Sequence, residues 1–262
     1  MCSALHAVRL RAAAPISLKR KTKLYYIYDG MTVSELRLLI KECVTELVEG
    51  PRDPAIFKAV FLAGGPGSGK SFITQKLGLT SMGFKKDDPD VMFQYLMRRD
   101  VLPMILDAIG SDQGQSIRKA ARDLTDTRTK TCFIEGRLGI IYDGTGKDYD
   151  KVMKLKLELE KIGYETCMVV VNADLDTSLD RNSKRDRRIP DDMVKRFWSD
   201  VQKNLGRFQS TFRDNFYIID NSSTTSPADL EREITRVHVK IKGWSMMPPK
   251  SPIAKQWLAE HP

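Results

Sequence analysis

Gly64-Gly65-Pro66-Gly67-Ser68-Gly69-Lys70-Ser71 matches the pattern G-x-x-x-x-G-K-[ST] at every fixed position. The residues before it, 57–63 (FKAVFLA), predict a short buried strand, and the residues after it, 72–77 (FITQKL), continue as a helix. A strand, a glycine-rich turn and a helix form the context that this motif requires. A turn that merely joins a strand to a helix does not need the Lys-Ser pair. The motif therefore predicts a nucleoside triphosphate site.

The glycines of this phosphate loop allow the backbone to curl, so that successive N–H groups point at phosphate oxygens. The start of the following helix adds free N–H groups and the positive end of its dipole. Lys70 is expected to reach the β- and γ-phosphates, and the Ser71 hydroxyl to bind Mg²⁺. The residues predicted to bind the nucleotide are Gly65, Pro66, Gly67, Ser68, Gly69, Lys70 and Ser71.

The composition is that of an ordinary globular protein: 262 residues, 41% hydrophobic and 29% charged. This length accommodates one good core with appendages or two small domains. No stretch approaches the ~20 apolar residues that span a bilayer, so no membrane partner is expected. The net charge of +9 favours anionic ligands such as nucleotides, nucleic acid or phosphosugars, although a solubilising surface with a basic tail explains it equally well.

The chain has four cysteines and three histidines, and both sets limit its chemistry. The cysteines are far apart and form no C-x-x-C pair, which indicates free thiols in a reducing compartment; we expect a cytoplasmic protein. The histidines all lie far from the phosphate loop, at His6, His238 and His261. A carboxylate should therefore carry any proton transfer.

Residues 1–54 are expected to form a basic arm and a small appendage. Residues 1–23 contain Arg and Lys but no acidic residue, which fits either a transit peptide or a plain disordered arm. Residues 24–28 (LYYIY) predict a short strand. Apolar residues spaced i, i+3, i+4 between 36 and 47 predict a helix that Gly50-Pro51 ends. No chemistry is visible in this segment.

Strands alternate with helices in residues 55–222, the expected catalytic domain. Apolar runs predict strands at 57–63, 138–143, 166–171 and 216–220. Helices are expected at 115–133, 151–162, 175–181 and 191–212. With a phosphate loop after the first strand, this order predicts an α/β protein with a doubly wound, mostly parallel sheet. Residues 223–262 should form a C-terminal helix, from about Pro227 to Val239, and a Pro- and Trp-containing tail.

Asp143 ends an apolar strand and is followed by Gly144-Thr145. Proteins with a phosphate loop place an acid at such a strand end to hold Mg²⁺. An Asp that only caps the strand end is the alternative interpretation. The close backbone approach that glycine permits favours the metal role.

Arginines are concentrated between two predicted helices, at Arg181, Arg185, Arg187 and Arg188. Arginine is always charged and binds phosphate oxygens two at a time. Because phosphoryl transfer is catalysed mainly by positioning and charge neutralisation, we predict that this stretch is a lid over the nucleotide. A solvated basic helix end is the alternative.

The carboxylates Asp87, Asp88 and Asp90 follow the phosphate-loop helix and lead into a helix at Val91–Met97. They are candidates to accept the proton of an attacking hydroxyl. Helix N-capping explains at least one of them without any chemistry. Both interpretations stay open for each residue.

From about Phe57 to Ser222 the chain resembles the P-loop kinases that include zeta toxins and phage-type polynucleotide kinases. The resemblance rests on the phosphate loop, the Asp-Pro-Asp before Val91, Tyr142-Asp143-Gly144-Thr145, and Arg181-x-x-x-Arg185 running into Arg-Arg-Ile-Pro. It implies that an Asp after the second strand is the general base, for which Asp90 matches best and Asp88 next. Lys85-Lys86 stand where apolar residues are usual, which predicts a poor strand there. By similarity to adenylate-kinase-like lids, Arg181 would stack near adenine and Arg185 would contact phosphate.

The sequence thus predicts a Mg·ATP-dependent kinase that phosphorylates a hydroxyl. The predicted residues are Lys70, Arg185 and Arg188 for charge neutralisation, Ser71 and Asp143 for Mg²⁺, and Asp90 for proton abstraction. Acceptors that fit the resemblance are a polynucleotide 5′-hydroxyl, a nucleotide sugar or another small metabolite. Two alternatives stay open: an ATP-dependent nucleic-acid-binding protein with weak or no phosphotransfer, and an accessory module whose ATP site is structural.

Overall fold

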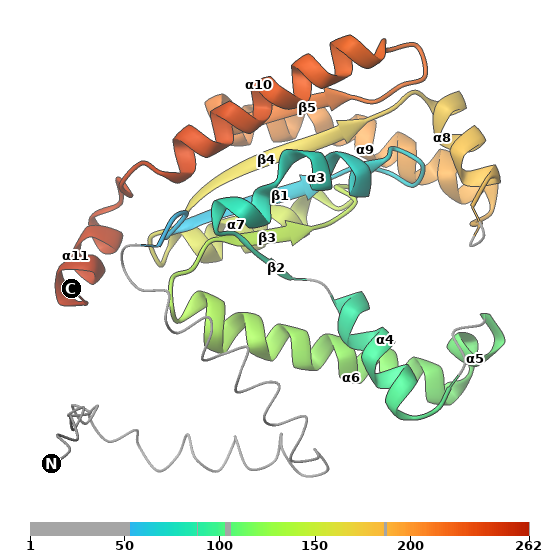
Figure 1. Cartoon of the computed structure of the whole chain (residues 1–262), viewed down its shortest axis with the longest axis horizontal. Helices are drawn as coiled ribbons and strands as arrows, with labels where there is room; N and C mark the ends of the chain where they lie inside the picture. The colour runs from blue at the N-terminus through green and yellow to red at the C-terminus, as the bar shows by residue number, and fades with distance from the viewer. Residues whose placement is uncertain (1–52, 88, 103–105, 186–187, 262) are drawn as a thin grey trace, which may run out of the picture. The chain divides into compact units, whose positions relative to one another are not determined.

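A five-stranded parallel sheet lies at the centre of the described part of the chain (Figure 1). The computed structural model describes residues 53–87, 89–102, 106–185 and 188–261, which all belong to one compact unit, Glu49–Pro262. The strand order is β2-β3-β1-β4-β5, and every neighbouring pair is parallel. The strands are β1 (Lys58–Ala63), β2 (Lys85–Asp87), β3 (Ile140–Asp143), β4 (Glu165–Asn172) and β5 (Phe216–Asp220).

Helices connect the strands and cover both faces of the sheet (Figure 1). They are α3 (Lys70–Leu77), α4 (Pro89–Arg99), α5 (Leu106–Gly110), α6 (Asp112–Arg128), α7 (Tyr149–Glu160), α8 (Leu175–Ser183), α9 (Asp191–Phe212), α10 (Pro227–Ser245) and α11 (Pro252–Glu260). None of these helices is long and apolar enough to cross a membrane.

The central strands bury both faces because successive side chains alternate between two cores. In β1, Val60 and Leu62 belong to the first core, with residues of α3 and α10. Phe61 and Ala63 belong to the second core, with residues of α7, α9 and α11. The phosphate-loop helix α3 therefore covers one face of the sheet and the long helix α9 covers the other.

A third apolar cluster joins α4, α5 and α6 to one another, and Figure 1 shows these helices grouped beyond β2. Its buried members are Phe93, Leu96, Met97, Ile109, Ile117 and Ala121. A π-helical turn, Thr129–Ile134, follows α6 and places Phe133 in the second core. This turn connects the helical group to the sheet.

The predicted parallel sheet is confirmed. Lys85 and Lys86, which predict a poor strand, form with Asp87 the three-residue strand β2, with Lys85 opposite Ile140 and Asp87 opposite Tyr142 of β3. The open edge of β3 offers backbone donors and acceptors, and pairing with them needs no apolar side chains.

Two helices also differ in extent from the prediction. α6 begins at Asp112 and gives way to the π-helical turn at Thr129, whereas the sequence predicts one helix over 115–133. α10 continues to Ser245, so that Trp244 packs against the first core. The predicted basic arm, the strand at 24–28, the helix between 36 and 47, Asp88 and Arg187 lie outside the described residues.

A buried ion pair lies at the amino end of the two central strands. Lys58 Nζ is 2.6 Å from Glu165 Oε2, and the Lys58 side chain is fully buried. Glu165 Oε1 also accepts the backbone N–H of Lys250 at 2.6 Å. Because Glu165→Gln would leave a buried ammonium uncompensated, it should lower the free energy of unfolding by about 3 kcal/mol, measured by urea denaturation.

Glu231→Gln is the matched control for this prediction. Glu231 pairs with Lys76 at 3.6 Å, and both side chains are exposed. Exposed pairs contribute little, so this change should cost less than about 0.5 kcal/mol. Equal losses in the two variants would show that burial does not set the value of the Lys58–Glu165 pair.

Candidate active site

The phosphate loop follows β1 and leads into α3, whose N-cap is Gly69. Gly67 and Gly69 have φ angles of 81° and 80°, a left-handed conformation that residues with a Cβ rarely adopt. A Cβ on Gly67 would lie only 2.3 Å from the carbonyl oxygen of Ser178 on α8. Glycine is therefore required by the turn itself and by the close approach of α8.

Two side chains hold carbonyl groups of the loop. Asn221, which follows β5, donates its side-chain amide to the Ser68 carbonyl at 2.8 Å. Nη1 of Arg181, on α8, lies 3.4 Å from the carbonyl oxygen of Gly67 and 3.5 Å from that of Ser68. The loop backbone is thus bound by α8 and by the end of β5, two elements far from it in sequence.

Lys70 and Asp143 form an ion pair beside the loop. β1 and β3 are neighbours, with Leu62 opposite Asp143, so the acid at the end of β3 lies next to the start of α3. Lys86 Nζ, from β2, lies 3.7 Å from the second Asp143 oxygen. Ser71 lies exposed in the first turn of α3. The structure therefore brings a predicted lysine and a predicted acid together.

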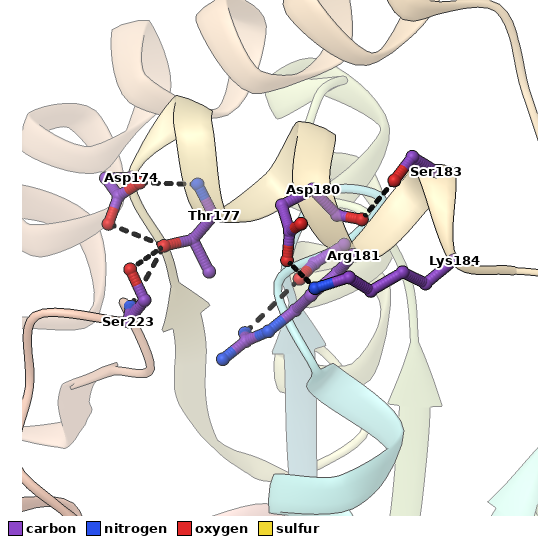
Figure 2. Close-up of polar contacts among 8 residues, drawn as sticks. Asp174, Thr177, Asp180, Arg181, Ser183, Lys184 and Ser223 are labelled. Carbon is purple, nitrogen blue, oxygen red and sulfur yellow. Dashed lines mark hydrogen bonds and ion pairs between the residues drawn. The ribbon is translucent and has the colours of Figure 1, made fainter.

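A small polar network binds the start of α8 to the residues after β5 (Figure 2). Asp174 caps the helix: Oδ1 accepts the Thr177 N–H at 2.6 Å and Oδ2 accepts the Thr177 hydroxyl at 2.8 Å. The Thr177 oxygen also accepts the backbone N–H of Ser223 at 2.9 Å. The hydrogen bond from Thr177 N–H holds the pKa of Asp174 below its ordinary value, because it stabilises the charged carboxylate.

The stretch between α8 and α9 is joined at its ends by Asn182, which is fully buried. The Asn182 amide donates to the Ile189 carbonyl at 2.8 Å, and its Oδ1 accepts the Ile189 N–H at 3.3 Å. Arg185 and Arg188 lie on this stretch and are exposed. In Figure 2, Lys184 folds back along α8 to Asp180, at 2.6 Å. Asn182 thus ties the end of α8 to Ile189, while Arg185 and Arg188 face solvent.

Asp90 lies exposed in the first turn of α4. β2 runs parallel to β3, with Asp87 opposite Tyr142, the residue before Asp143. The chain therefore leaves β2 at the same edge at which Asp143 ends β3, and α4 begins there. Ligands of open α/β sheets bind at this carboxyl edge.

The sequence interpretation missed Asn182 and Asn221. Both are buried and both bind backbone groups near the site. Asn221 directly follows β5, and a polar residue just after a parallel strand is a signal that would have drawn attention to it. Asn182 lies within α8, where no local pattern distinguishes it from a solvated helix residue.

The parallel sheet with its phosphate loop, together with the family match of residues 44–231, makes the chain a P-loop kinase, a phosphotransferase. Residues 44–231 match the sequence model of the family described as Zeta toxin. This match covers more than half of the chain, which therefore belongs to the zeta toxin family. The resemblance inferred from the phosphate loop, strand-end acid and lid arginines is confirmed.

Several solved structures share this fold. The native AvrRxo1-ORF1:-ORF2 complex has a TM-score of 0.53 and 13% identity, covering 95% of this chain and 91% of that chain. The PezAT chromosomal toxin–antitoxin system of Streptococcus pneumoniae has a TM-score of 0.50 and 16% identity, covering 83% and 97%. The AvrRxo1-ORF1:-ORF2 structure with ATP has a TM-score of 0.52 and 15% identity, covering 80% and 70%. Sequence comparison with curated proteins finds no match.

Proposed function

We propose that this kinase transfers the γ-phosphate of Mg·ATP to a hydroxyl group. The observation that carries the proposal is the ion pair between Lys70 and Asp143 beside the phosphate loop. An arriving triphosphate would compete with Asp143 for Lys70, and the carboxylate would then be released from Lys70. The AvrRxo1 complex solved with ATP supports the choice of nucleotide.

Mg²⁺ would be held by the Ser71 hydroxyl and the Asp143 carboxylate, together with phosphate oxygens and water. A hydroxyl and a carboxylate are oxygen ligands, which suit this hard cation, and Mg²⁺ usually keeps several waters and few protein ligands. When bound, the cation would neutralise charge on the phosphates.

In the proposed reaction, the acceptor oxygen attacks the γ-phosphorus and the bond from the γ-phosphorus to the β,γ-bridging oxygen breaks, releasing ADP. The acceptor proton passes to Asp90, with Asp88 as the second candidate. Lys70, Arg185 and Arg188 are proposed to stabilise the negative charge on the transferring group. No histidine is assigned a role.

The acceptor class is tested by a labelling experiment. The full chain is incubated with γ-labelled ATP and Mg²⁺ in the presence of oligonucleotides with free 5′-hydroxyls, of nucleotide sugars, or of small metabolites. Transfer of label to one pool, absent with a Lys70→Ala variant, is the expected result. Label released only as inorganic phosphate, with every pool unlabelled, would contradict a kinase and favour an ATP-dependent binding protein.

Arg185→Ala should lower turnover by roughly 10²-fold while leaving ATP affinity nearly unchanged, because the lid is proposed to act on charge that develops in the transition state. Steady-state kinetics with the acceptor found by labelling measure both quantities. Lys184→Ala is the matched control, since Lys184 is the adjacent exposed cation and pairs with Asp180. A raised Michaelis constant for ATP with unchanged turnover would assign Arg185 to ground-state binding only.

A further inference from the structure

Asn221 is a buried amide that reaches from the end of β5 to the phosphate loop. Asn221 is only 6% exposed, and its Nδ2 donates to the Ser68 carbonyl at 2.8 Å. Its backbone N–H donates to the Asn172 carbonyl at 2.8 Å, at the end of β4. The donor is therefore held by the two strands that lie beyond β1, and it has little freedom to move away from the loop.

The hydrogen bond from Asn221 to the Ser68 carbonyl determines the direction of the Gly69 N–H group. In a trans peptide the carbonyl and the N–H of the next residue point in opposite directions. When Asn221 and Arg181 hold the Ser68 carbonyl, the N–H of Gly69 must point the other way. Gly69 is the N-cap of α3, so this N–H belongs to the set that a helix start offers to an anion.

The same contact accounts for the glycine at this position. A Cβ on Gly69 would lie 2.2 Å from Asn221 Nδ2, closer than atoms can approach. The φ angle of 80° at Gly69 independently disfavours a side chain. Asn221 and Gly69 thus fit one another, and the backbone of the loop is fixed where the two meet.

We propose that Asn221 is a positioning residue for the β-phosphate of the bound nucleotide: it orients the Ser68–Gly69 peptide so that the Gly69 N–H faces the phosphate. This inference rests on the proposed nucleotide site. In this proposal Asn221 acts through the Ser68 carbonyl, which its amide binds, and not through contact with the nucleotide.

The proposal predicts that changing Asn221 weakens binding of a nucleotide only when the nucleotide carries a β-phosphate. Calorimetry on the full chain compares ADP, which has that phosphate, with AMP, which lacks it. Asn221→Ala should weaken ADP binding about tenfold or more, because one hydrogen bond to a charged group is misdirected. AMP binding should stay within about twofold. Asn221→Asp, which keeps the shape and places a carboxylate against the Ser68 carbonyl, should weaken ADP binding at least as much and provides the test if the alanine variant does not fold.

Asn215→Ala is the matched control. Asn215 precedes β5, and its amide likewise donates to a backbone carbonyl, that of Thr166, at 3.3 Å. Replacing a purely structural amide should alter thermal stability and leave the ratio of ADP affinity to AMP affinity unchanged. We expect this result for Asn215→Ala. If the ratio of ADP affinity to AMP affinity were unchanged in both Asn221 variants, the role of Asn221 would be overturned, but the nucleotide site would not. A wild-type protein that binds neither ADP nor ATP would overturn the proposed nucleotide site, and the role of Asn221 with it.

Discussion

Replacing Lys70 by alanine should abolish measurable phosphoryl transfer, with a fall of about 10³-fold or more in kcat/KM, and should remove most ATP affinity. Lys70 is the cation at the fixed position of the phosphate loop, and it already holds a carboxylate, Asp143, in the structure. Its removal would leave the phosphates without that charge. It would also leave Asp143 beside Lys86, whose Nζ lies 3.7 Å from Asp143 Oδ2.

Calorimetry with Mg·ATP and a transfer assay measure the effect of Lys70→Ala, and circular dichroism establishes that the variant is folded. Lys76→Ala is the matched control, because Lys76 lies on the same helix and pairs only at the surface, with Glu231 at 3.6 Å. Normal ATP affinity and normal transfer in a folded Lys70→Ala protein would contradict the assignment of the site.

Asp90→Asn should reduce turnover by roughly 10²–10⁴-fold, the usual contribution of a general base. Asparagine keeps the shape of the side chain but cannot take the proton from the hydroxyl that is to be phosphorylated. ATP affinity should be retained, because Asp90 lies in the first turn of α4, outside the phosphate loop. Turnover is measured with the acceptor that the labelling experiment identifies.

Asp88→Asn is the comparison that tests this assignment of the base, and it should have the smaller effect. A large loss in Asp88→Asn combined with near-normal transfer in Asp90→Asn would move the base to Asp88. Near-normal transfer in both variants would leave the two carboxylates with no catalytic role, and the start of α4 would then be explained by helix capping alone.

Local patterns in the sequence determined most of the fold. Apolar runs and helical periodicity predicted four of the strands and the long helices, because a strand buried on both faces must be apolar along its length. This reasoning does not predict β2. Lys85 and Lys86 have no apolar signal, and they form a strand only because β3 presents an unpaired edge to them.

The sequence by itself also determined the phosphate loop, since its glycines, Lys70 and Ser71 are adjacent and their spacing carries the chemistry. Only the tertiary structure decided what holds that loop. Asn221 binds Ser68 from 153 residues away, and Arg181 reaches the same carbonyl from 113 residues away. A single amide or guanidinium binds one carbonyl through space. Such a contact leaves no periodic pattern in the sequence, and it exists only once parallel strands bring their carboxyl ends to one edge.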